Sequence, residues 1–351
     1  MKWIYALLLV APLALIAQHR HASPIAVFAL SALAIIPLSA LLGSATEQLA
    51  GHTGPTVGGL LSATLGNLSE LIIATLALRA GLIDLVKASI TGSILGNLLL
   101  VLGAAQLAGG LRYKVQRFNP QLAGMSISLL VTAVVGLVVP AIFRMAHPDP
   151  ARIATVRMSQ YIAALLIVGY GLSLLYSMGT HRAALGEGGD IAVGDEEEAL
   201  WSLRRALVVL FAAAAGIGVM SELLVGATEA AVKTLGLSQF FIGLILIPII
   251  GNAAEHSSAV MMALKNRMDL AVTIAIGSSI QVALLVAPLL VFIGMLVGQP
   301  MDLAFRTIEV TSVALAVQIG AAVVLDAESN WLEGALLLIV YSVMGVAFFF
   351  F

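Results

Sequence analysis

Two acidic residues stand inside long apolar stretches of this 351-residue chain, each at the end of the same short motif. Gly66-Asn67-Leu68-Ser69-Glu70 recurs as Gly251-Asn252-Ala253-Ala254-Glu255, displaced by 185 residues. An ionised side chain at the centre of a bilayer costs about 2.5–3.5 kcal/mol, and no Lys or Arg lies within either apolar core to pair these carboxylates. A proton on each carboxyl group, or a metal cation between them, removes that cost. Because both remedies use the same oxygens, protons and a cation compete there, which is the chemical requirement for an exchanger.

Amide side chains accompany both carboxylates. Asn67 and Asn252 each precede their glutamate by three residues, which places amide and carboxylate on the same side of a helix. Pro248 favours a helix break before Asn252 that would free carbonyl oxygens. Carboxylate, amide and carbonyl oxygens are hard ligands that suit calcium better than zinc or copper. We therefore expect Glu70 and Glu255 to hold a transported calcium ion, although these ligands alone do not separate calcium from manganese. The alternative is that the two asparagines only form hydrogen bonds between helices.

A second polar tier follows each motif. Gly92-Ser93-Ile94 recurs as Gly277-Ser278-Ser279, again displaced by 185 residues. On the helices after the two motifs, the polar residues at helical spacing are Ser93, Asn97, Ser278 and Gln281. Simple polarity of helix packing would also explain them. His256 adjoins Glu255, and because histidine titrates near neutral pH it would either shuttle protons or pack as a hydrogen-bonded side chain.

A third match lies upstream of the motifs. Ala45-Thr46-Glu47 corresponds to Ala227-Thr228-Glu229, with a displacement of 182 residues. Glu47 and Glu229 lie near the expected helix ends, so they would either line the approach of a cation or be merely solvated. Three matched polar islands in the same order indicate that the chain is a duplication.

The composition requires a membrane around these residues. Hydrophobic residues make up 60% of the chain and charged residues 10%, with a mean hydropathy of +1.06, whereas soluble domains carry roughly a quarter charged residues. The apolar runs are continuous, so the spans are helices and not barrel strands. A net charge of −2 offers no basic field for nucleic acid. With no Cys, no His-Glu-x-x-His pattern and no nucleophile–base pair, we expect neither an enzyme nor a resident cofactor.

The apolar runs predict an all-α integral membrane protein with about eleven transmembrane helices. We place them near 3–17, 25–43, 55–79, 84–108, 121–143, 159–178, 202–231, 238–264, 269–297, 304–325 and 332–351. The helices of Asn67 and Asn252 are then third and eighth, an odd number apart, so the two copies cross the membrane in opposite directions. Inverted-topology repeats are typical of secondary transporters, which bind substrate between the copies. We therefore expect a peripheral first helix (1–18), a five-helix repeat (25–178), an acidic connector (179–201) and a second five-helix repeat (202–351).

The first helix, the orientation in the membrane and the role of the connector each leave alternatives open. Lys2 followed by a short apolar run resembles a signal peptide. A cleavage site needs a small residue at two positions, and in Leu15-Ile16-Ala17 the first of these is the large Leu15, which favours a retained helix. Basic residues divide almost equally between the two sides, so the positive-inside rule gives no clear orientation. The connector would attract or sense cations, or serve only as a solvated link, through Asp195, Glu196, Glu197 and Glu198.

These islands resemble the cation/proton exchanger (CAX) family of the calcium/cation antiporter superfamily. The resemblance covers nearly the whole chain and rests on Gly-Asn-x-x-Glu in both copies, followed by Gly-Ser-Ile-x-x-Asn from Gly92 and Gly-Ser-Ser-Ile-Gln from Gly277. Sodium/calcium exchangers of the superfamily tend to carry Ser/Thr-Ser-x-Pro-Glu in the first tier and Asn or Asp in place of this Gln. Neither pattern is present here.

The resemblance implies a ten-helix transport core with a peripheral first helix. Glu70 and Glu255 would alternately hold calcium and protons, with Glu47 and Glu229 on the approach paths and the connector facing the cytosol. The residues implied to line the site are Asn67, Asn252, Ser93, Asn97, Ser278 and Gln281, with His256 beside them. We therefore expect a proton-coupled calcium antiporter in a prokaryotic cytoplasmic membrane, with homo-oligomerisation left open. A sodium-coupled calcium exchanger, and a cation channel with the same carboxylates, are the alternatives.

Overall fold

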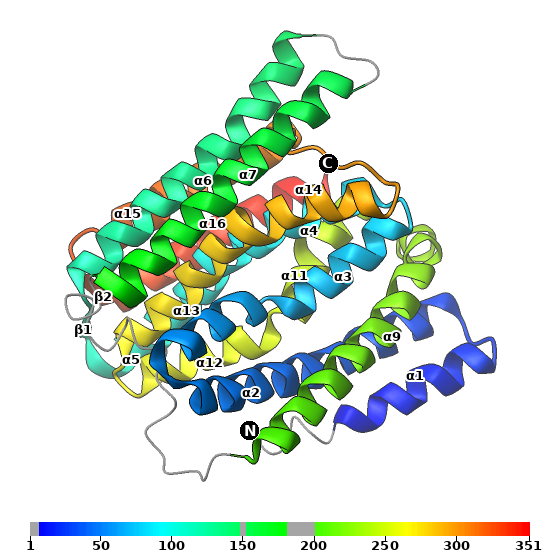
Figure 1. The fold of residues 1–351 in the computed structure, drawn as a ribbon, viewed down its shortest axis with the longest axis horizontal. Helices are drawn as coiled ribbons and strands as arrows, with labels where there is room; N and C mark the ends of the chain where they lie inside the picture. Colours follow the sequence, from blue (N-terminus) through cyan, green and yellow to red (C-terminus); the bar gives the residue numbers. More distant parts are fainter. Residues whose placement is uncertain (1–6, 148–151, 181–200) are drawn as a thin grey trace. The chain divides into compact units, whose positions relative to one another are not determined.

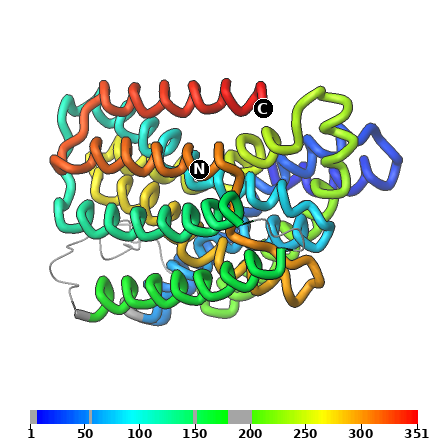
Figure 2. The backbone as a smooth tube through the Cα atoms, turned by 90° about the horizontal axis from the view of Figure 1, so that it is seen from above, coloured from blue at the N-terminus to red at the C-terminus, as the bar shows by residue number. Residues whose placement is uncertain are grey.

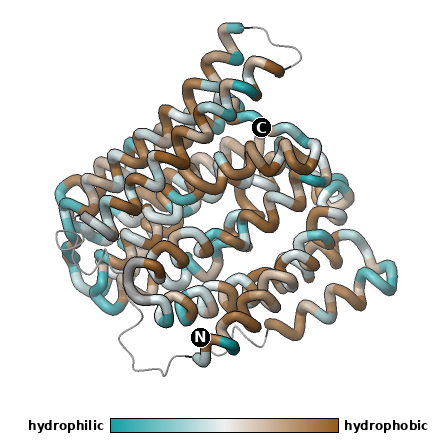
Figure 3. The backbone as a smooth tube through the Cα atoms, viewed as in Figure 1, coloured by the Kyte–Doolittle hydropathy of each residue, from teal (hydrophilic) through white to brown (hydrophobic). Residues whose placement is uncertain are grey.

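The computed structural model describes residues 7–147, 152–180 and 201–351. Within them, nine helices are long and apolar enough to cross a membrane: Pro24–Thr53, Val57–Arg79, Ile83–Tyr113, Pro120–Ala146, Ile153–Gly179, Leu203–Leu235, Met268–Leu296, Thr307–Val324 and Trp331–Phe349. A tenth span is a bent pair, Gln239–Gly251 with Ala253–Leu264, and the apolar helix Leu7–His19 is shorter. Figure 3 shows apolar residues along the lengths of these helices and hydrophilic ones gathered at their turns. The predicted fold class, an all-helical multi-pass membrane protein, is confirmed.

The second predicted helix is longer than expected. After the short helix α1 (Val10–His19), α2 runs over Pro24–Leu65, where Ser23 caps its start by accepting the Ala26 N–H at 3.4 Å. The prediction that it ends near residue 43 is wrong. Gly58 comes so close to the carbonyl of Ala50 that a Cβ would not fit. In the same region the span Pro24–Thr53 ends and the span Val57–Arg79, which continues through α3, begins.

Both motif helices break at their asparagine. Asn67 separates α2 from α3 (Leu68–Arg79) with φ −96° and ψ 26°. Asn252 separates α11 (Ile247–Gly251) from α12 (Ala253–Leu264) with φ −100° and ψ 10°. The predicted break in the second copy is confirmed, and the Asn252 Nδ2 donates to the Pro248 carbonyl at 3.0 Å, which satisfies one of the carbonyls near the break. The first copy also breaks at its asparagine, with Ala63 where the second copy has Pro248. Val57–Arg79 still counts as a single span, whereas Gln239–Gly251 and Ala253–Leu264 are bent by 59°.

The helices after the motifs carry matched π-helical turns. α4 (Ile83–Leu95) passes through η2 (Gly96–Val101) into α5 (Leu102–Tyr113). In the second copy, α13 (Met268–Gln281) passes through η6 (Val282–Val286) into α14 (Ala287–Leu296). A π-turn shifts the register of the helix and is common at functional sites. No pattern in the sequence predicts these turns; η2 contains Asn97 of the second polar tier, and η6 starts directly after Gln281.

The outer helices complete each copy. α6 (Pro120–Ala146), α7 (Ile153–Leu175) with its continuation η3 (Tyr176–Thr180), and α15 (Thr307–Val324) run alongside one another in both views (Figures 1 and 2). α16 (Trp331–Phe349) ends the fold. The short strands β1 (Val115–Arg117) and β2 (Glu328–Asn330) pair antiparallel and so tie two turns together. The buried Gln116 of β1 donates to the carbonyl of Ala263 at 2.9 Å, which fixes the strand to the end of α12.

The second copy opens with α9 (Leu203–Leu235), α10 (Gln239–Phe241) and η5 (Ile242–Leu246). By compactness the chain forms two units. The first unit is the described part of residues 1–89, 193–254 and 348–351, and the second unit is the described part of 90–192 and 255–347. Each unit takes corresponding elements from both copies of the sequence repeat. In the first unit α2 packs along α9, and α1 packs on α2.

Candidate cation site

Each motif carboxylate occupies the third position of a helix that starts directly after the break. Glu70 lies in the first turn of α3 and Glu255 in the first turn of α12. The first turn of a helix has backbone N–H groups without intrahelical partners and the positive end of the helix dipole, and both stabilise a carboxylate there. The break at each asparagine therefore creates a local environment in which a buried carboxylate can be charged as well as protonated.

In the first unit, Glu70 keeps one oxygen uncommitted. The neighbouring Ser69 hydroxyl donates to Glu70 Oε2 at 3.2 Å. Glu70 Oε1 is buried and has no hydrogen-bond partner within the described part of the chain. A proton or a cation is the kind of partner that a buried carboxylate oxygen requires.

Glu70 of the first copy also lies against the motif of the second copy. A Cβ built on Gly251 would lie 3.7 Å from Glu70 Cγ and from Ile73 Cδ1. The two motif asparagines, Asn67 and Asn252, are both buried. The first unit thus brings one carboxylate against Gly251 in the motif of the other copy.

In the second unit, Ser278 joins the two tiers. Its hydroxyl donates to Glu255 Oε2 at 3.0 Å and accepts from Asn97 Nδ2 at 2.8 Å. Asn97 Oδ1 is buried and has no hydrogen-bond partner among the described residues. The hydrogen bonds Asn97–Ser278–Glu255 bring three of the predicted residues together, one from the first copy and two from the second.

The remaining predicted residues of this tier lie nearby in sequence. Ser93 is buried on α4, one turn before Asn97. Gln281, the last residue of α13, and His256, next to Glu255 on α12, are partly exposed. Their roles at a cation or proton site stay predictions.

Glu47 and Glu229 are exposed on helices that pack together in the first unit. Glu229 Oε1 forms an ion pair with Lys233 Nζ at 2.8 Å, one turn along α9, and both side chains are largely in the open (82% and 74% exposed). Such an exposed pair contributes little to stability. Glu47 lies six residues before the end of the span Pro24–Thr53, as Glu229 lies six residues before the end of α9. The acidic connector residues Asp195 and Glu196–Glu198 lie outside the described residues.

The side chains near one another in each unit limit which ligands a bound cation could have. Among the described residues, no group of three or more His, Cys, Asp and Glu side chains lies close enough to hold a metal ion. A cation in either unit would therefore be held by few carboxylate oxygens, supplemented by neutral hydroxyl, amide and carbonyl oxygens. Calcium accepts such mixed oxygen ligands.

A buried carboxylate at the start of α15 is among the residues that the sequence did not single out. Glu309, in the first turn of α15, is 2% exposed in the second unit. Its Oε2 accepts the backbone N–H of Arg306 at 2.7 Å, and its Oε1 accepts from the Thr91 hydroxyl at 3.4 Å. Helix capping accounts for the first contact, and the glutamate near the start of a predicted span was the available signal.

A duplicated set of membrane-spanning helices, broken at polar motifs that each carry a partly buried carboxylate, defines the class of secondary transporters. Comparison with known proteins agrees. The family model described as sodium/calcium exchanger protein matches residues 23–179 and again residues 205–350, which correspond to the two copies.

Individual relatives cover the whole chain. The chain is 45% identical over 360 residues to a Ca²⁺/H⁺ antiporter of Aphanothece halophytica, with 99% of this chain and 96% of the relative covered. It is 41% identical over 339 residues to the Ca²⁺/H⁺ antiporter ChaA of Bacillus subtilis, with 96% of each covered. The solved structure of native YfkE superimposes with a TM-score of 0.86 at 37% identity, covering 99% of this chain and all of that one. The chain therefore belongs to the Ca²⁺/H⁺ antiporter (CAX) family within the sodium/calcium exchanger superfamily, a family of transporters and not of enzymes.

Proposed function

We propose that the chain exchanges calcium for protons by alternating access, and that Glu70 and Glu255 are the carboxylates that alternately hold the cation and the protons. Family membership supports the exchange. The observation that carries the residue assignment is the matched placement of the two carboxylates, each in the first turn after a helix break at a buried asparagine.

The chemistry follows from competition for oxygens. When both carboxyl groups are ionised, their negative charge and the surrounding neutral oxygens favour a divalent cation. Protonation removes that charge and the cation leaves, so the proton-rich side of the membrane is the side of calcium release. Deprotonation on the other side restores the binding form. Asn97 and Ser278, which are joined to Glu255, would supply neutral ligands or hold the carboxylate in place.

Purified protein in liposomes tests this proposal. An acid interior should drive calcium uptake at neutral external pH, whereas an imposed sodium gradient without a pH gradient should not. Calcium flux that follows the sodium gradient would support a sodium-coupled exchanger, and flux that ignores both gradients would support a channel; either result overturns proton exchange. Adding manganese or strontium as competitor measures the selectivity that the ligand types leave open.

Two further parts of the proposal concern the setting. The relatives of Aphanothece and Bacillus support a prokaryotic cytoplasmic membrane as the location, with the bilayer as the chain's constant partner. We propose no resident cofactor, so treatment with a chelator before reconstitution should leave the exchange rate unchanged once calcium is supplied. In the same proposal, Glu47 and Glu229 attract calcium toward the site from the surface of the first unit.

A further inference from the structure

A hollow of about 430 Å³ lies at the start of α7, in the second unit. The first two turns of that helix supply Arg152, Ile153, Val156, Arg157 and Gln160, and Pro300 from the turn after α14 closes the hollow. Its lining thus combines two guanidinium groups and an amide with apolar side chains. This region takes no part in the cation chemistry described above.

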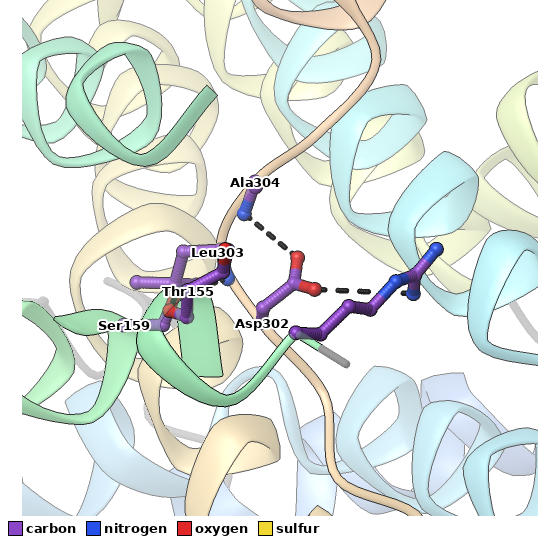
Figure 4. Close-up of polar contacts among 6 residues, drawn as sticks. Thr155, Ser159, Asp302, Leu303 and Ala304 are labelled. Atoms are coloured by element: carbon purple, nitrogen blue, oxygen red, sulfur yellow. Dashed lines mark hydrogen bonds and ion pairs between the residues drawn. The ribbon is translucent and has the colours of Figure 1, made fainter. Parts of the chain in front are cut away.

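One wall of the hollow is held in place by a buried carboxylate. Asp302 is 1% exposed, and its Oδ2 lies 3.9 Å from a guanidinium nitrogen of Arg152. The other oxygen, Oδ1, accepts the N–H of Ala304 at 2.9 Å, and Ser159 of α7 accepts the N–H of Leu303 at 2.9 Å (Figure 4). These bonds fix the segment after Pro300 against α7. The hollow is therefore built by the fold and not by loose surface side chains.

The charge in the hollow is not balanced. Arg152 shares its charge with Asp302 at the limit of ion-pair distance, while Arg157 makes no ion pair with any described residue. Two guanidinium groups line the hollow and one buried carboxylate lies beside Arg152, so the described residues around the hollow carry a net positive charge. The complementary ligand is an anion, and guanidinium groups suit phosphate because they can donate two parallel hydrogen bonds.

The same face of α7 leads into the membrane. Ile153, Tyr161, Leu165, Val168 and Leu172 are exposed and follow one another at intervals of a helical face. Arg157 lies on this face, four residues after Ile153 and four before Tyr161. An exposed apolar face of a spanning helix lies against lipid tails. An anion bound at Arg157 would thus lie at the end of an apolar helix face along which acyl chains can pack.

We propose that this hollow binds the phosphate headgroup of an anionic phospholipid, with an acyl chain lying along the exposed face of α7. Arg157 and Arg152 contact the phosphate, Gln160 donates to its ester oxygens or to the glycerol, and Ile153 and Val156 contact the top of the chain. Basic pockets at membrane helices take anionic headgroups in this way. The alternative is an arginine that only extends its side chain to the membrane–water boundary. That role would require neither the fixed segment after Pro300 nor a second guanidinium group nearby.

Native mass spectrometry of the full-length protein, stripped of lipid in detergent, tests the proposal. The probes are phosphatidylglycerol, phosphatidylcholine with the same chains, and glycerol 3-phosphate as a headgroup without chains. We expect the protein to retain phosphatidylglycerol several-fold more than phosphatidylcholine, and glycerol 3-phosphate not to displace it. Arg157→Gln should abolish that preference, and Arg157→Lys should restore part of it by returning the charge without the paired donors.

Arg144→Gln is the matched control. Arg144 lies in the last turn of α6, next along the chain to the start of α7, and does not line the hollow, so its loss should leave the preference intact. Equal retention of the two lipids by the unaltered protein, or equal losses in the Arg157 and Arg144 variants, would overturn the proposal. Displacement by glycerol 3-phosphate would overturn it in favour of a free-phosphate site. A change of oligomeric mass in Arg157→Gln with no change in lipid retention would overturn it in favour of contact with a second copy.

Discussion

The two motif carboxylates have the same backbone setting and different partners. Glu70 accepts from the hydroxyl of Ser69, its own neighbour in α3, whereas Glu255 accepts from Ser278 on α13. The sequence explains part of the difference, because Ala254 stands in the second copy where Ser69 stands in the first. With no hydroxyl beside it, Glu255 relies on a partner from another helix, and that partner connects it to Asn97 of the other copy. Duplication therefore preserved the helix break and the carboxylate, while the hydrogen bonds around the carboxylate diverged.

The largest effect should come from removing either charge. Glu70→Gln and Glu255→Gln keep the shape of the side chain but cannot exchange a proton for a cation, so each should lower pH-driven calcium uptake in liposomes at least 100-fold. Glu222→Gln, at an exposed position of α9, is the control and should transport normally. All three should elute as folded protein from size-exclusion chromatography. Normal uptake by either of the first two variants would show that its glutamate is not needed for exchange, although the two glutamates have the same backbone environment.

A smaller effect should follow when the link in the second unit is cut. Ser278→Ala removes the donor to Glu255 and leaves the buried Asn97 amide without its acceptor. Losing a partner of a buried polar group costs about 1–3 kcal/mol, so calcium affinity should fall about tenfold, as measured by the KM of uptake. Ser128→Ala, whose hydroxyl donates only within α6 to Gly124, should leave the KM unchanged. An unchanged KM in Ser278→Ala would show that the hydrogen bonds of Ser278 do not contribute to calcium binding.

The sequence predicted most of the framework because helix starts and repeats have local signatures. Asn119 and Pro120 mark the start of α6, where the Asn119 side chain accepts the N–H groups of Gln121 and Leu122 as a cap, and the expected start at 121 was one residue away. The 185-residue displacement relates Glu70 to Glu255 and Ser93 to Ser278, and the spacing of four residues from Ser93 adds Asn97 to the predicted second tier.

What the sequence could not predict depends on tertiary contacts. The π-helical turns η2 and η6 have no local sequence signal, because they are set by how each helix fits its neighbours. The partner of Glu255 could not be chosen from four polar candidates without the positions of the helices. Asp302 stands in a turn that hydropathy marks as exposed, yet it is buried because Arg152 and the Ala304 N–H satisfy it.

The Ser69–Ala254 difference predicts opposite shifts in pH dependence. Ser69→Ala removes a hydrogen bond to the charged form of Glu70, so the proton is held more firmly and calcium should bind only at higher pH. Ala254→Ser adds the same donor beside Glu255, and the midpoint should move to lower pH. A net hydrogen bond of about 1 kcal/mol corresponds to about 0.7 pH unit. Titrating calcium binding by the purified variants measures both midpoints, and shifts in the same direction would contradict the explanation of the divergence.

The smallest effect should come from the contact between the copies at Gly251. A Cβ at this position would meet Glu70 Cγ and Ile73 Cδ1 at 3.7 Å, which is ordinary van der Waals distance. Gly251→Ala should therefore fold normally and reduce calcium uptake only two- to fivefold, because the methyl group restricts the movement of Glu70 without displacing it. Gly251→Val, with two further carbons, should reduce uptake much more at a similar melting temperature. If alanine and valine have the same effect on uptake, the space beside Glu70 is not what Gly251 provides, and the requirement for glycine lies in the backbone before Asn252.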